Sequence, residues 1–272
     1  MKVKALLTAT LASALLLSGC GSDQKEGQDN DPLVVGMECN YAPFNWQTPE
    51  ESETSISLGG AGYADGYDIR IANYLSEELD RDVEIKKIAW DGLIPALNAG
   101  DINVIIAGMT ERKGLDFTDP YYDSEMVMIV RKSDSEYLDY TSIQDFSGKT
   151  IVGQKNTNYD YVIDQIKDVK HATPKNNVPE MLVALQKHEV DGITAEYPVA
   201  TSILTANPDL AIVRFDEGKG FDVDTTVSIG MKKGSKDTEL YNEINDALHR
   251  LSQETREQWM EDAIATQPKM EE

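Results

Sequence analysis

The chain has 272 residues, and 48 acidic against 25 basic side chains give it a formal net charge of −23. A surface this acidic repels nucleic acid and anionic lipid headgroups, which excludes nucleic-acid binding. The charge is compatible with solubility alone, and also with the steering of a cationic solute toward a cleft. Residues from 33 onward number roughly 240, enough for one large domain or two smaller ones.

The N-terminus has the pattern of a bacterial lipoprotein signal. Residues 1 to 20 carry two lysines, an apolar stretch over residues 5 to 17, and then L-S-G-C ending at Cys20. The stretch is too short to span about 30 Å of hydrocarbon comfortably, and a small-residue cleavage site follows it, so we predict a signal peptide rather than a transmembrane anchor. We expect lipid on Cys20 to hold an extracytoplasmic domain on the cell membrane through the lipid anchor only. Residues 21 to 32 contain no large apolar side chain and predict a flexible tether.

Cysteine and histidine usage gives no sign of a metal or cofactor. If Cys20 is acylated, Cys39 is the only thiol left, and we expect it to be a small buried hydrophobe rather than a reactive group. The three histidines, His171, His188 and His249, are scattered among polar neighbours and make no metal-binding spacing. We therefore predict neither a metal nor a cofactor.

Strand-like and helical patterns alternate along the rest of the chain, which favours an α/β architecture with mainly parallel strands. The strand-like runs are residues 33–35, 83–88, 104–107, 127–131, 150–152, 192–195, 211–215 and 227–231. The helical patterns are residues 68–79, 93–98, 179–188, 199–206 and a long final helix from 238 to about 264. Residues 48–63, rich in Glu, Ser and Gly, predict a β-hairpin or mobile loop, either a lid over a ligand or an exposed decoration.

Residues 90–122 are the strongest candidate for part of a binding site. A helical pattern stops at Gly100, a buried parallel strand follows, and the chain then reaches Gly108. Ligands of open α/β sheets lie outside the carboxyl ends of strands, so Gly108, Thr110 and Arg112 are expected to meet a small molecule. We expect a helix to begin near Arg112, where free backbone N–H groups would also favour an anion.

Several motifs in this region occur in a recognisable order. They read W-D-G-L-I-P-A-L, D-I-N-V-I-I-A-G-M-T, E-R-K and D-F-T-D-P-Y-Y, and residues 36–44, 66–75, 148–158 and 190–200 extend the match. Together they resemble the extracellular solute-binding proteins of family 3, the polar amino acid receptors of ABC importers. The chain departs from that family where Thr110 runs directly into Glu111 and Arg112, and where Asn156 replaces a glycine.

The resemblance implies a two-lobe, type II periplasmic-binding-protein-like α/β fold. Two hinge crossovers would lie near residues 123–126 and 222–225, so that the lobes can close over a ligand. The first lobe would comprise residues 33–124 and 225–272, and the second residues 125–224. The resemblance also implies a monomer that delivers a free amino acid to a cognate ABC permease and its ATPase.

A site for a free amino acid must satisfy a carboxylate, an ammonium and a side chain, because closure buries all three. Arg112 supplies a fork suited to the carboxylate. By resemblance, Thr157 and Asn158 contact the carboxylate from the second lobe, and Glu196 accepts hydrogen bonds from the ammonium.

The resemblance also assigns the ligand side chain to two aromatic residues, Tyr41 and Trp90, which would enclose it. Aromatic faces attract a cation by about 2 kcal/mol when desolvated. Glu38 matches the position of an acid in basic amino acid receptors. Together these residues favour an arginine-like or lysine-like ligand.

Each of these residues also has a structural alternative. Arg112 could be a surface helix arginine, Thr157 and Asn158 could cap the following helix, and Glu196 could stabilise a helix dipole. For Phe44 and Trp46, core packing is the preferred interpretation over a supporting wall of the site.

Two other functional classes remain open. A dehydratase-like enzyme on the same fold would need a committed acid and base pair, and the sequence indicates none. No G-x-S-x-G or zinc motif is present either. A ligand-sensing or adhesion lipoprotein would keep the same binding fold and use it for signalling or attachment. We prefer a transport receptor without catalytic residues.

Overall fold

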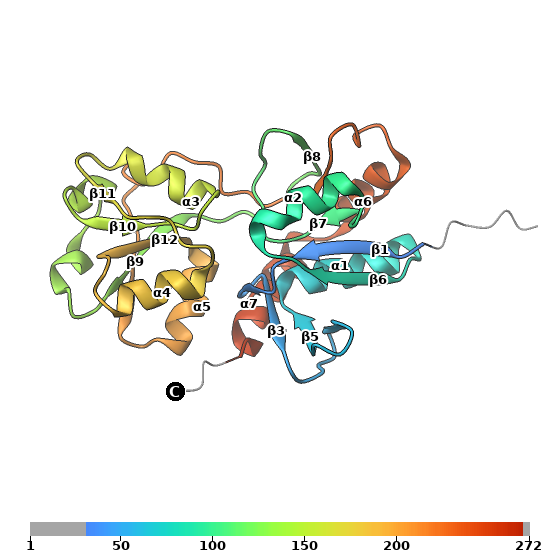
Figure 1. Cartoon of the computed structure of the whole chain (residues 1–272), viewed down its shortest axis with the longest axis horizontal. Coiled ribbons are helices and arrows are strands. Elements are labelled where there is room, and N and C mark those ends of the chain that lie inside the picture. The colour runs from blue at the N-terminus through green and yellow to red at the C-terminus, as the bar shows by residue number, and fades with distance from the viewer. Residues whose placement is uncertain (1–30, 269–272) are drawn as a thin grey trace, which may run out of the picture. The chain divides into compact units, whose positions relative to one another are not determined.

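Two five-stranded sheets organise the residues that the structure, a computed structural model, describes, which are residues 31–268 (Figure 1). The first sheet has the order β6-β1-β7-β14-β8 and is the basis of lobe 1; its strands are Val83–Lys87, Leu33–Met37, Val104–Ile105, Gly230–Lys232 and Leu115–Phe117. The second sheet has the order β11-β10-β12-β9-β13 and is the basis of lobe 2; its strands are Lys170–His171, Thr150–Val152, Gly192–Glu196, Met126–Arg131 and Leu210–Val213. The expected signal peptide, Cys20 and nearly all of the tether lie outside the described residues.

The expectation of mainly parallel strands is confirmed, because four of the five strands in each sheet run in the same direction. In lobe 1, β1 pairs with β6 and β7 in parallel, while β14 pairs with β7 and β8 antiparallel. In lobe 2, β10 has parallel neighbours and β9 has antiparallel ones. The strands β9 and β14 are the first to follow each crossover, and each runs against the other four strands of its sheet.

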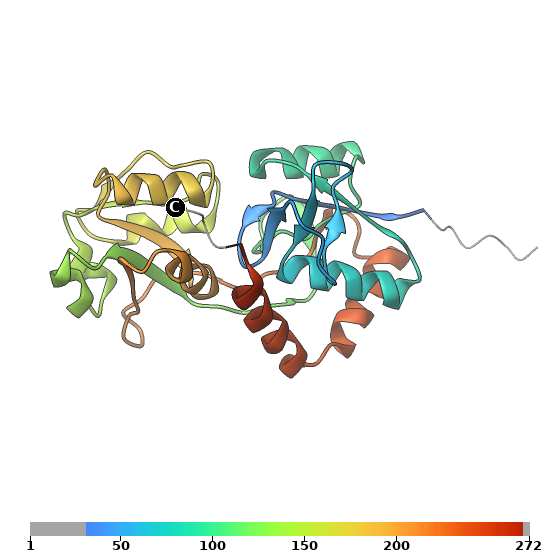
Figure 2. The ribbon, with the colours of Figure 1, turned by 90° about the horizontal axis from the view of Figure 1, so that it is seen from below.

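Helices flank both sheets, and Figure 2 shows α1 and α2 on opposite faces of the lobe 1 sheet. Most of the expected helices are present with shifted ends: α1 is Tyr67–Leu79, α2 Trp90–Ala99, α4 Val178–Gln186 and α5 Tyr197–Ala206. The short α3 is Asn158–Tyr161, and three 3₁₀ turns, η1 Ser135–Asp139, η2 Ile143–Phe146 and η3 Val162–Gln165, complete lobe 2. Gly100 ends α2 in the left-handed conformation, as a glycine at this position usually does.

The single long final helix expected from the sequence is wrong. The structure has two helices, α6 at Glu239–Arg250 and α7 at Gln253–Thr266, visible in Figure 2 as a bent pair. Leu251 takes an extended conformation, and the Ser252 hydroxyl accepts a hydrogen bond from the backbone N–H of Thr255. A serine cap of this kind starts a new helix, and the sequence pattern alone did not separate it from an interior serine.

The insertion at residues 48–63 forms part of a small third sheet, in the order β2-β3-β5-β4. Its strands are Asn40–Tyr41, Asn45–Thr48, Tyr63–Asp65 and Ile56–Ser57. Asp65 accepts hydrogen bonds from the hydroxyls of Ser52 and Thr54, and Asn73 of α1 donates to the Thr54 carbonyl at 2.7 Å. The predicted β-hairpin is therefore confirmed, and these hydrogen bonds hold it against lobe 1.

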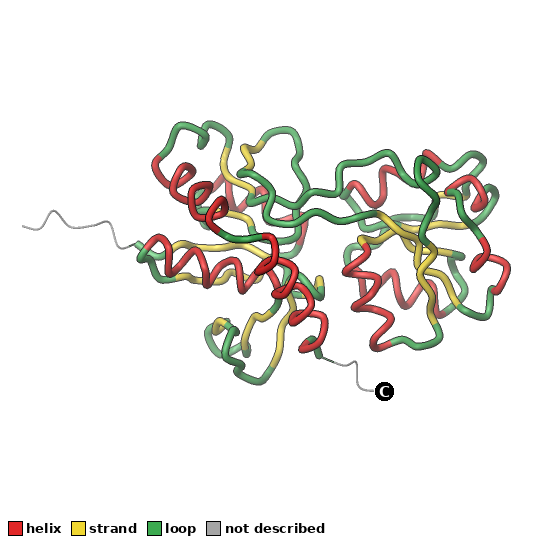
Figure 3. The backbone as a smooth tube through the Cα atoms, turned by 180° about the vertical axis from the view of Figure 1, so that it is seen from behind, coloured by secondary structure: helices red, strands yellow, loops and turns green. Residues whose placement is uncertain are grey.

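Two crossovers join the sheets, and Figure 3 shows them as neighbouring loop segments. One leads from β8 to β9 and the other from β13 to β14. They are linked to each other, because the Thr225 hydroxyl donates to the Ser124 carbonyl and the Val227 N–H donates to the Tyr122 carbonyl at 2.9 Å.

No helix among residues 31–268 has the length and apolar character that a membrane span requires.

Candidate functional site

Glu196 is a fully buried carboxylate at the carboxyl end of β12, with tyrosine hydroxyls from both lobes bonded to it. Tyr159 of lobe 2 donates to Oε1, and Tyr41 of lobe 1 donates to Oε2 at 3.2 Å. Glu196 precedes α5 but makes no capping hydrogen bond with its side chain. Burial raises the pKa of this carboxyl to about 8, although the two tyrosine hydrogen bonds oppose the shift. This carboxylate is therefore directed to the boundary between the lobes and not to its own helix.

Tyr41 reaches lobe 2 because it lies over a glycine. Its ring stacks on Phe44 at a centroid distance of 5.4 Å, and a Cβ added to Gly108 would lie 2.8 Å from Tyr41 Cε1. Gly108 has φ +57, in the left-handed region that glycine adopts without strain. Phe44 and Trp46 are buried in the core, which confirms the packing interpretation preferred for them.

Glu38 is a second buried carboxylate at the same boundary, with 4% of its surface exposed. Gln154 of lobe 2 donates to it over long distances of 3.4 and 3.5 Å. With its amide nitrogen turned toward Glu38, Asn40 donates to Oε1 at 3.0 Å. Burial raises the pKa of the Glu38 carboxyl to about 7. Among residues 31–268 its side-chain hydrogen-bond partners are the neutral amides of Gln154 and Asn40, so the carboxylate has capacity for a cation.

Trp90 and Arg112 meet the loop before α3 from the opposite lobe. Arg112 Nη2 donates to the Asn156 carbonyl at 2.9 Å, and Trp90 Nε1 donates to the same oxygen at 3.3 Å. The guanidinium carbon lies 5.8 Å from the centroid of the Trp90 ring. The arginine is thus oriented by an aromatic face and a carbonyl oxygen.

The helix expected after Thr110 is wrong. Residues 108–114 are irregular and lead directly into β8, with Gly114 turning the chain at φ +95. Arg112 is therefore placed by its side-chain contacts and not by a helix terminus.

The alternative role of the Thr157 side chain, capping of the following helix, is wrong. Thr157 precedes α3 but makes no capping bond with its side chain, and its hydroxyl donates to the Gln154 carbonyl at 2.6 Å. Asn158 is the first residue of the helix.

The candidate residues from both lobes line a common small cavity of about 20 Å³. Its walls are Trp90, Gly108, Thr110, Arg112, Thr157, Asn158 and Tyr159. Tyr41 and Glu196 join this group through Tyr159, and Glu38 joins through Gln154. Six of the nine residues that the sequence singled out for a ligand therefore line this cavity, and Glu196, Tyr41 and Glu38 are linked to its walls by hydrogen bonds.

Sequence reasoning missed Tyr159 and Gln154. Both are buried, and both lie in or just after the loop that follows β10. Their position at the carboxyl end of a strand, beside Thr157 and Asn158, is the signal that could have indicated them.

Cys39 is 3% exposed, and burial raises the pKa of its thiol to about 12, so it is the unreactive buried residue expected. In the part of the chain that the structure describes, no cluster of three or more His, Cys, Asp or Glu side chains could hold a metal ion.

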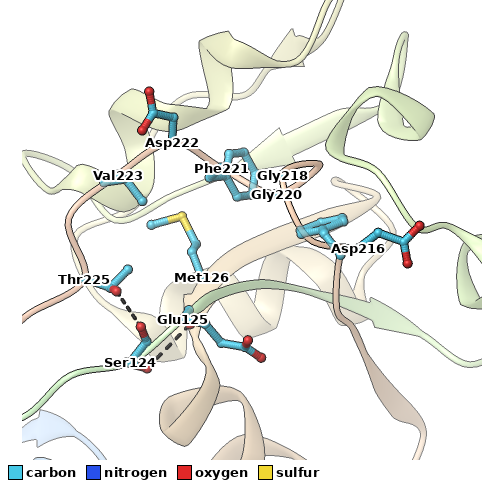
Figure 4. A pocket seen from close by; sticks show the side chains of 11 residues that line it. Ser124, Glu125, Met126, Asp216, Gly218, Gly220, Phe221, Asp222, Val223 and Thr225 are labelled. Atoms are coloured by element: carbon cyan, nitrogen blue, oxygen red, sulfur yellow. Dashed lines mark hydrogen bonds between the residues drawn. The ribbon is translucent and has the colours of Figure 1, made fainter.

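A larger cavity, of about 500 Å³, lies elsewhere, beside the crossovers (Figure 4). Met126 projects toward Val223 and Phe221 inside it, whereas the carboxylates of Asp216 and Asp222 point away. Its lining includes neither Glu38 nor Glu196. The larger cavity is therefore not the candidate site, because it lacks the buried carboxylates.

The lobes, crossovers and boundary carboxylates define a two-lobed binding protein. Residues 33–262 match the model for bacterial extracellular solute-binding proteins, family 3, and the chain belongs to that family.

Individual relatives are distant but cover nearly the whole chain. A probable histidine-binding protein of Neisseria gonorrhoeae is 26% identical, over 92% of this chain and 91% of the relative. ABC transporter arginine-binding protein 1 of Escherichia coli is also 26% identical, over 94% and 98% of the two chains. Among solved structures, the arginine-bound form of a truncated ArgBP from T. maritima has a TM-score of 0.67 and 27% identity, covering 82% of this chain and 97% of that one.

Proposed function

We propose that this protein captures a free basic amino acid between its lobes and delivers it to the permease of an ABC importer. The observation that carries the proposal is the pair of buried carboxylates, Glu38 and Glu196, at the boundary between the lobes. Buried carboxylates are retained when a cation or hydrogen bonds compensate them. The ligand classes of the relatives, among them arginine and histidine, support the same chemistry.

Glu196 would bind the ligand ammonium. A carboxylate can accept about four hydrogen bonds, and the hydroxyls of Tyr41 and Tyr159 use two of these positions. The remaining capacity suits the N–H donors of an ammonium. The two tyrosines would then orient the carboxylate from opposite lobes.

Arg112 would bind the ligand carboxylate, with Thr110, the backbone N–H of Thr157 and Asn158 as further donors around the shared cavity. Arg112 pairs bidentately with a carboxylate more readily than with a single carbonyl oxygen. A ligand carboxylate would therefore compete well with the Asn156 carbonyl for the guanidinium. The ligand side chain would extend past Tyr41 and Trp90 toward Glu38.

Closure would join the contributions of both lobes, with residues 33–124 and 225–272 moving as one body and residues 125–224 as the other. Ligand stabilises the closed state only through contacts that the open state lacks. Glu196, Thr157 and Asn158 lie on the opposite lobe from Trp90 and Arg112, so one ligand can bridge the two sets. We propose no catalytic role for any of these residues.

We also propose that the chain is a lipoprotein, with lipid on Cys20 and a tether over residues 21–32. The expected consequence is that a Cys20→Ser variant is released from the membrane fraction of the producing bacterium. Retention of that variant in washed membranes would contradict the lipid anchor.

Isothermal titration calorimetry tests the ligand class. We expect L-arginine or L-lysine to bind more tightly than L-glutamine and L-cystine. Tight binding of a neutral amino acid together with weak binding of arginine and lysine would contradict the basic class. Uptake of the labelled ligand in a deletion strain then separates transport from sensing, because a sensor would leave uptake unchanged.

A further inference from the structure

A second set of contacts joins the lobes beside the candidate ligand site. Asp91, in the first turn of α2, accepts hydrogen bonds on both carboxylate oxygens. Lys155 Nζ lies 2.9 Å from Oδ2, and Asn156 Nδ2 lies 2.7 Å from Oδ1. Asp91 belongs to lobe 1, whereas Lys155 and Asn156 are adjacent residues of lobe 2. One carboxylate therefore holds two consecutive residues of the opposite lobe.

Asn156 is held by its backbone as well. Its carbonyl oxygen accepts from Arg112 and Trp90 of lobe 1, while its side chain donates to Asp91. Its φ is +60, in the left-handed region that asparagine enters more easily than most residues. A single residue of lobe 2 is thus bound by three side chains of lobe 1.

The loop that carries Asn156 is fastened to lobe 2 by its own hydrogen bonds. The Lys155 N–H donates to the Lys175 carbonyl at 2.8 Å, and Gln154 Nε2 donates to the Asn176 carbonyl at 3.1 Å. Because of these hydrogen bonds, Lys155 and Asn156 move together with the rest of lobe 2.

We propose that Asp91, Lys155 and Asn156 form a clasp between the lobes that slows ligand release without contacting the ligand. The proposal rests on the proposed function, because it requires that the lobes separate when ligand leaves. Asp91 and Lys155 would be positioning residues for closure. Their contacts add to the stability of the closed state whichever amino acid is bound.

The expected effect is moderate, because the charged pair is partly solvated. The side chains of Asp91 and Lys155 keep 47% and 49% exposure, and salt screens such pairs. The Asn156 amide adds a charge-assisted hydrogen bond to the same carboxylate. We expect loss of the clasp to accelerate release about three- to tenfold.

Three variants remove the clasp in different ways. Asp91→Ala removes both contacts, and Lys155→Met removes the charge while keeping most of the side-chain stem. Asn156→Gly removes the amide and tolerates the positive φ, so it tests the contact without backbone strain. Asp101→Ala is the matched control, because Asp101 is an exposed acid of the same lobe just beyond α2, outside the clasp.

Stopped-flow measurement of L-arginine release tests the clasp. We expect faster release in all three variants, an unchanged melting temperature without ligand for Asn156→Gly, and wild-type release for Asp101→Ala. High salt should accelerate release in the wild type more than in Asp91→Ala. Equal release rates in the wild type and Asp91→Ala would overturn the clasp.

A readout without ligand separates failure of the clasp from failure of the proposed function. Donor and acceptor dyes on the two lobes report their separation by single-molecule energy transfer. If the wild type does not bind L-arginine, the proposed ligand class fails, yet the clasp still predicts a larger mean separation in Asp91→Ala than in Asp101→Ala. Identical distributions in those two variants would overturn the clasp whatever the ligand.

Discussion

The hydroxyl of Tyr41 in lobe 1 donates a hydrogen bond of 3.2 Å to Glu196 Oε2 in lobe 2, and the carboxylate that accepts it is fully buried. Tyr159 donates to the other oxygen from within lobe 2. The protonation state of Glu196 and the separation of the lobes therefore depend on each other, because an opening motion that removes Tyr41 also removes one hydrogen bond from the charged form.

Binding of an amino acid should weaken as the pH falls below about 8. Burial raises the pKa of Glu196 to about 8, so at pH 6 most molecules hold a proton that an ammonium ligand must displace. We expect the dissociation constant to rise by up to about tenfold per pH unit below that pKa. Calorimetry at pH 7 in buffers of different ionisation enthalpy should detect proton release on binding. A dissociation constant that is flat between pH 6 and 8 would contradict this role of Glu196.

Removal of the Tyr159 hydroxyl should weaken binding more than removal of the Tyr41 hydroxyl. A hydrogen bond to a charged group contributes about 1.5 to 3 kcal/mol, and the Tyr41 contact, at 3.2 Å, is long for an O–H···O hydrogen bond. Tyr159→Phe should therefore raise the dissociation constant about tenfold or more at pH 7 and shift its pH dependence to higher pH. Tyr161→Phe, an exposed tyrosine of the same helix, is the control.

Glu38→Gln should stabilise the protein above pH 7 while reducing its preference for a cationic ligand. Burial raises the pKa of Glu38 from 4.5 to about 7, so its ionisation costs folding free energy. That cost is absent below pH 4.5, grows between pH 4.5 and 7, and reaches at most about 3 kcal/mol above pH 7.

Urea denaturation across that pH range measures the Glu38 effect. The gain of Glu38→Gln over the wild type should be near zero at pH 4 and largest above pH 7. The ratio of arginine to glutamine affinity should fall in the same variant. A variant that is less stable at pH 8 than at pH 4, relative to the wild type, would show that Glu38 is already compensated in the folded chain.

Gly108→Ala should damage the site more than Gly114→Ala. Both glycines have positive φ, so both substitutions introduce backbone strain of about 1 kcal/mol or more. Only Gly108 also lies against Tyr41, at 2.8 Å from the added Cβ, whereas nothing lies within 4 Å of a Cβ on Gly114. We expect similar losses in melting temperature from strain but at least tenfold weaker ligand binding for Gly108→Ala alone. Equal binding losses would show that Tyr41 can shift without consequence.

The sequence indicated the site because its residues follow strand ends, a position that periodicity reveals. Glu196 and Thr157 come after predicted strands, and the ordered motifs carried Tyr41, Trp90 and Arg112 by resemblance. Those residues do meet in the structure, although their roles toward a ligand stay predictions. Tyr159 was missed because a tyrosine in a helical pattern is usually packed in the core.

Other features depend on contacts between distant segments, which a local pattern does not contain. The clasp joins Asp91 to Lys155 and Asn156, and nothing near Asp91 in the sequence identifies its partners. The antiparallel strands β9 and β14 follow from how the crossovers enter each sheet. The break at Ser252 was missed because serine occurs both as a cap and within helices.

The hydrogen bonds between the two crossovers limit how the lobes can move. A single connecting segment would allow bending in any direction as well as twisting. Two segments fastened side by side, through Thr225 to Ser124 and Val227 to Tyr122, resist twisting and sliding. The lobes can then move relative to each other mainly by one rotation, so the same side chains meet the same partners each time the lobes close. A ligand site whose residues are divided between the two lobes therefore has the same geometry after each closure.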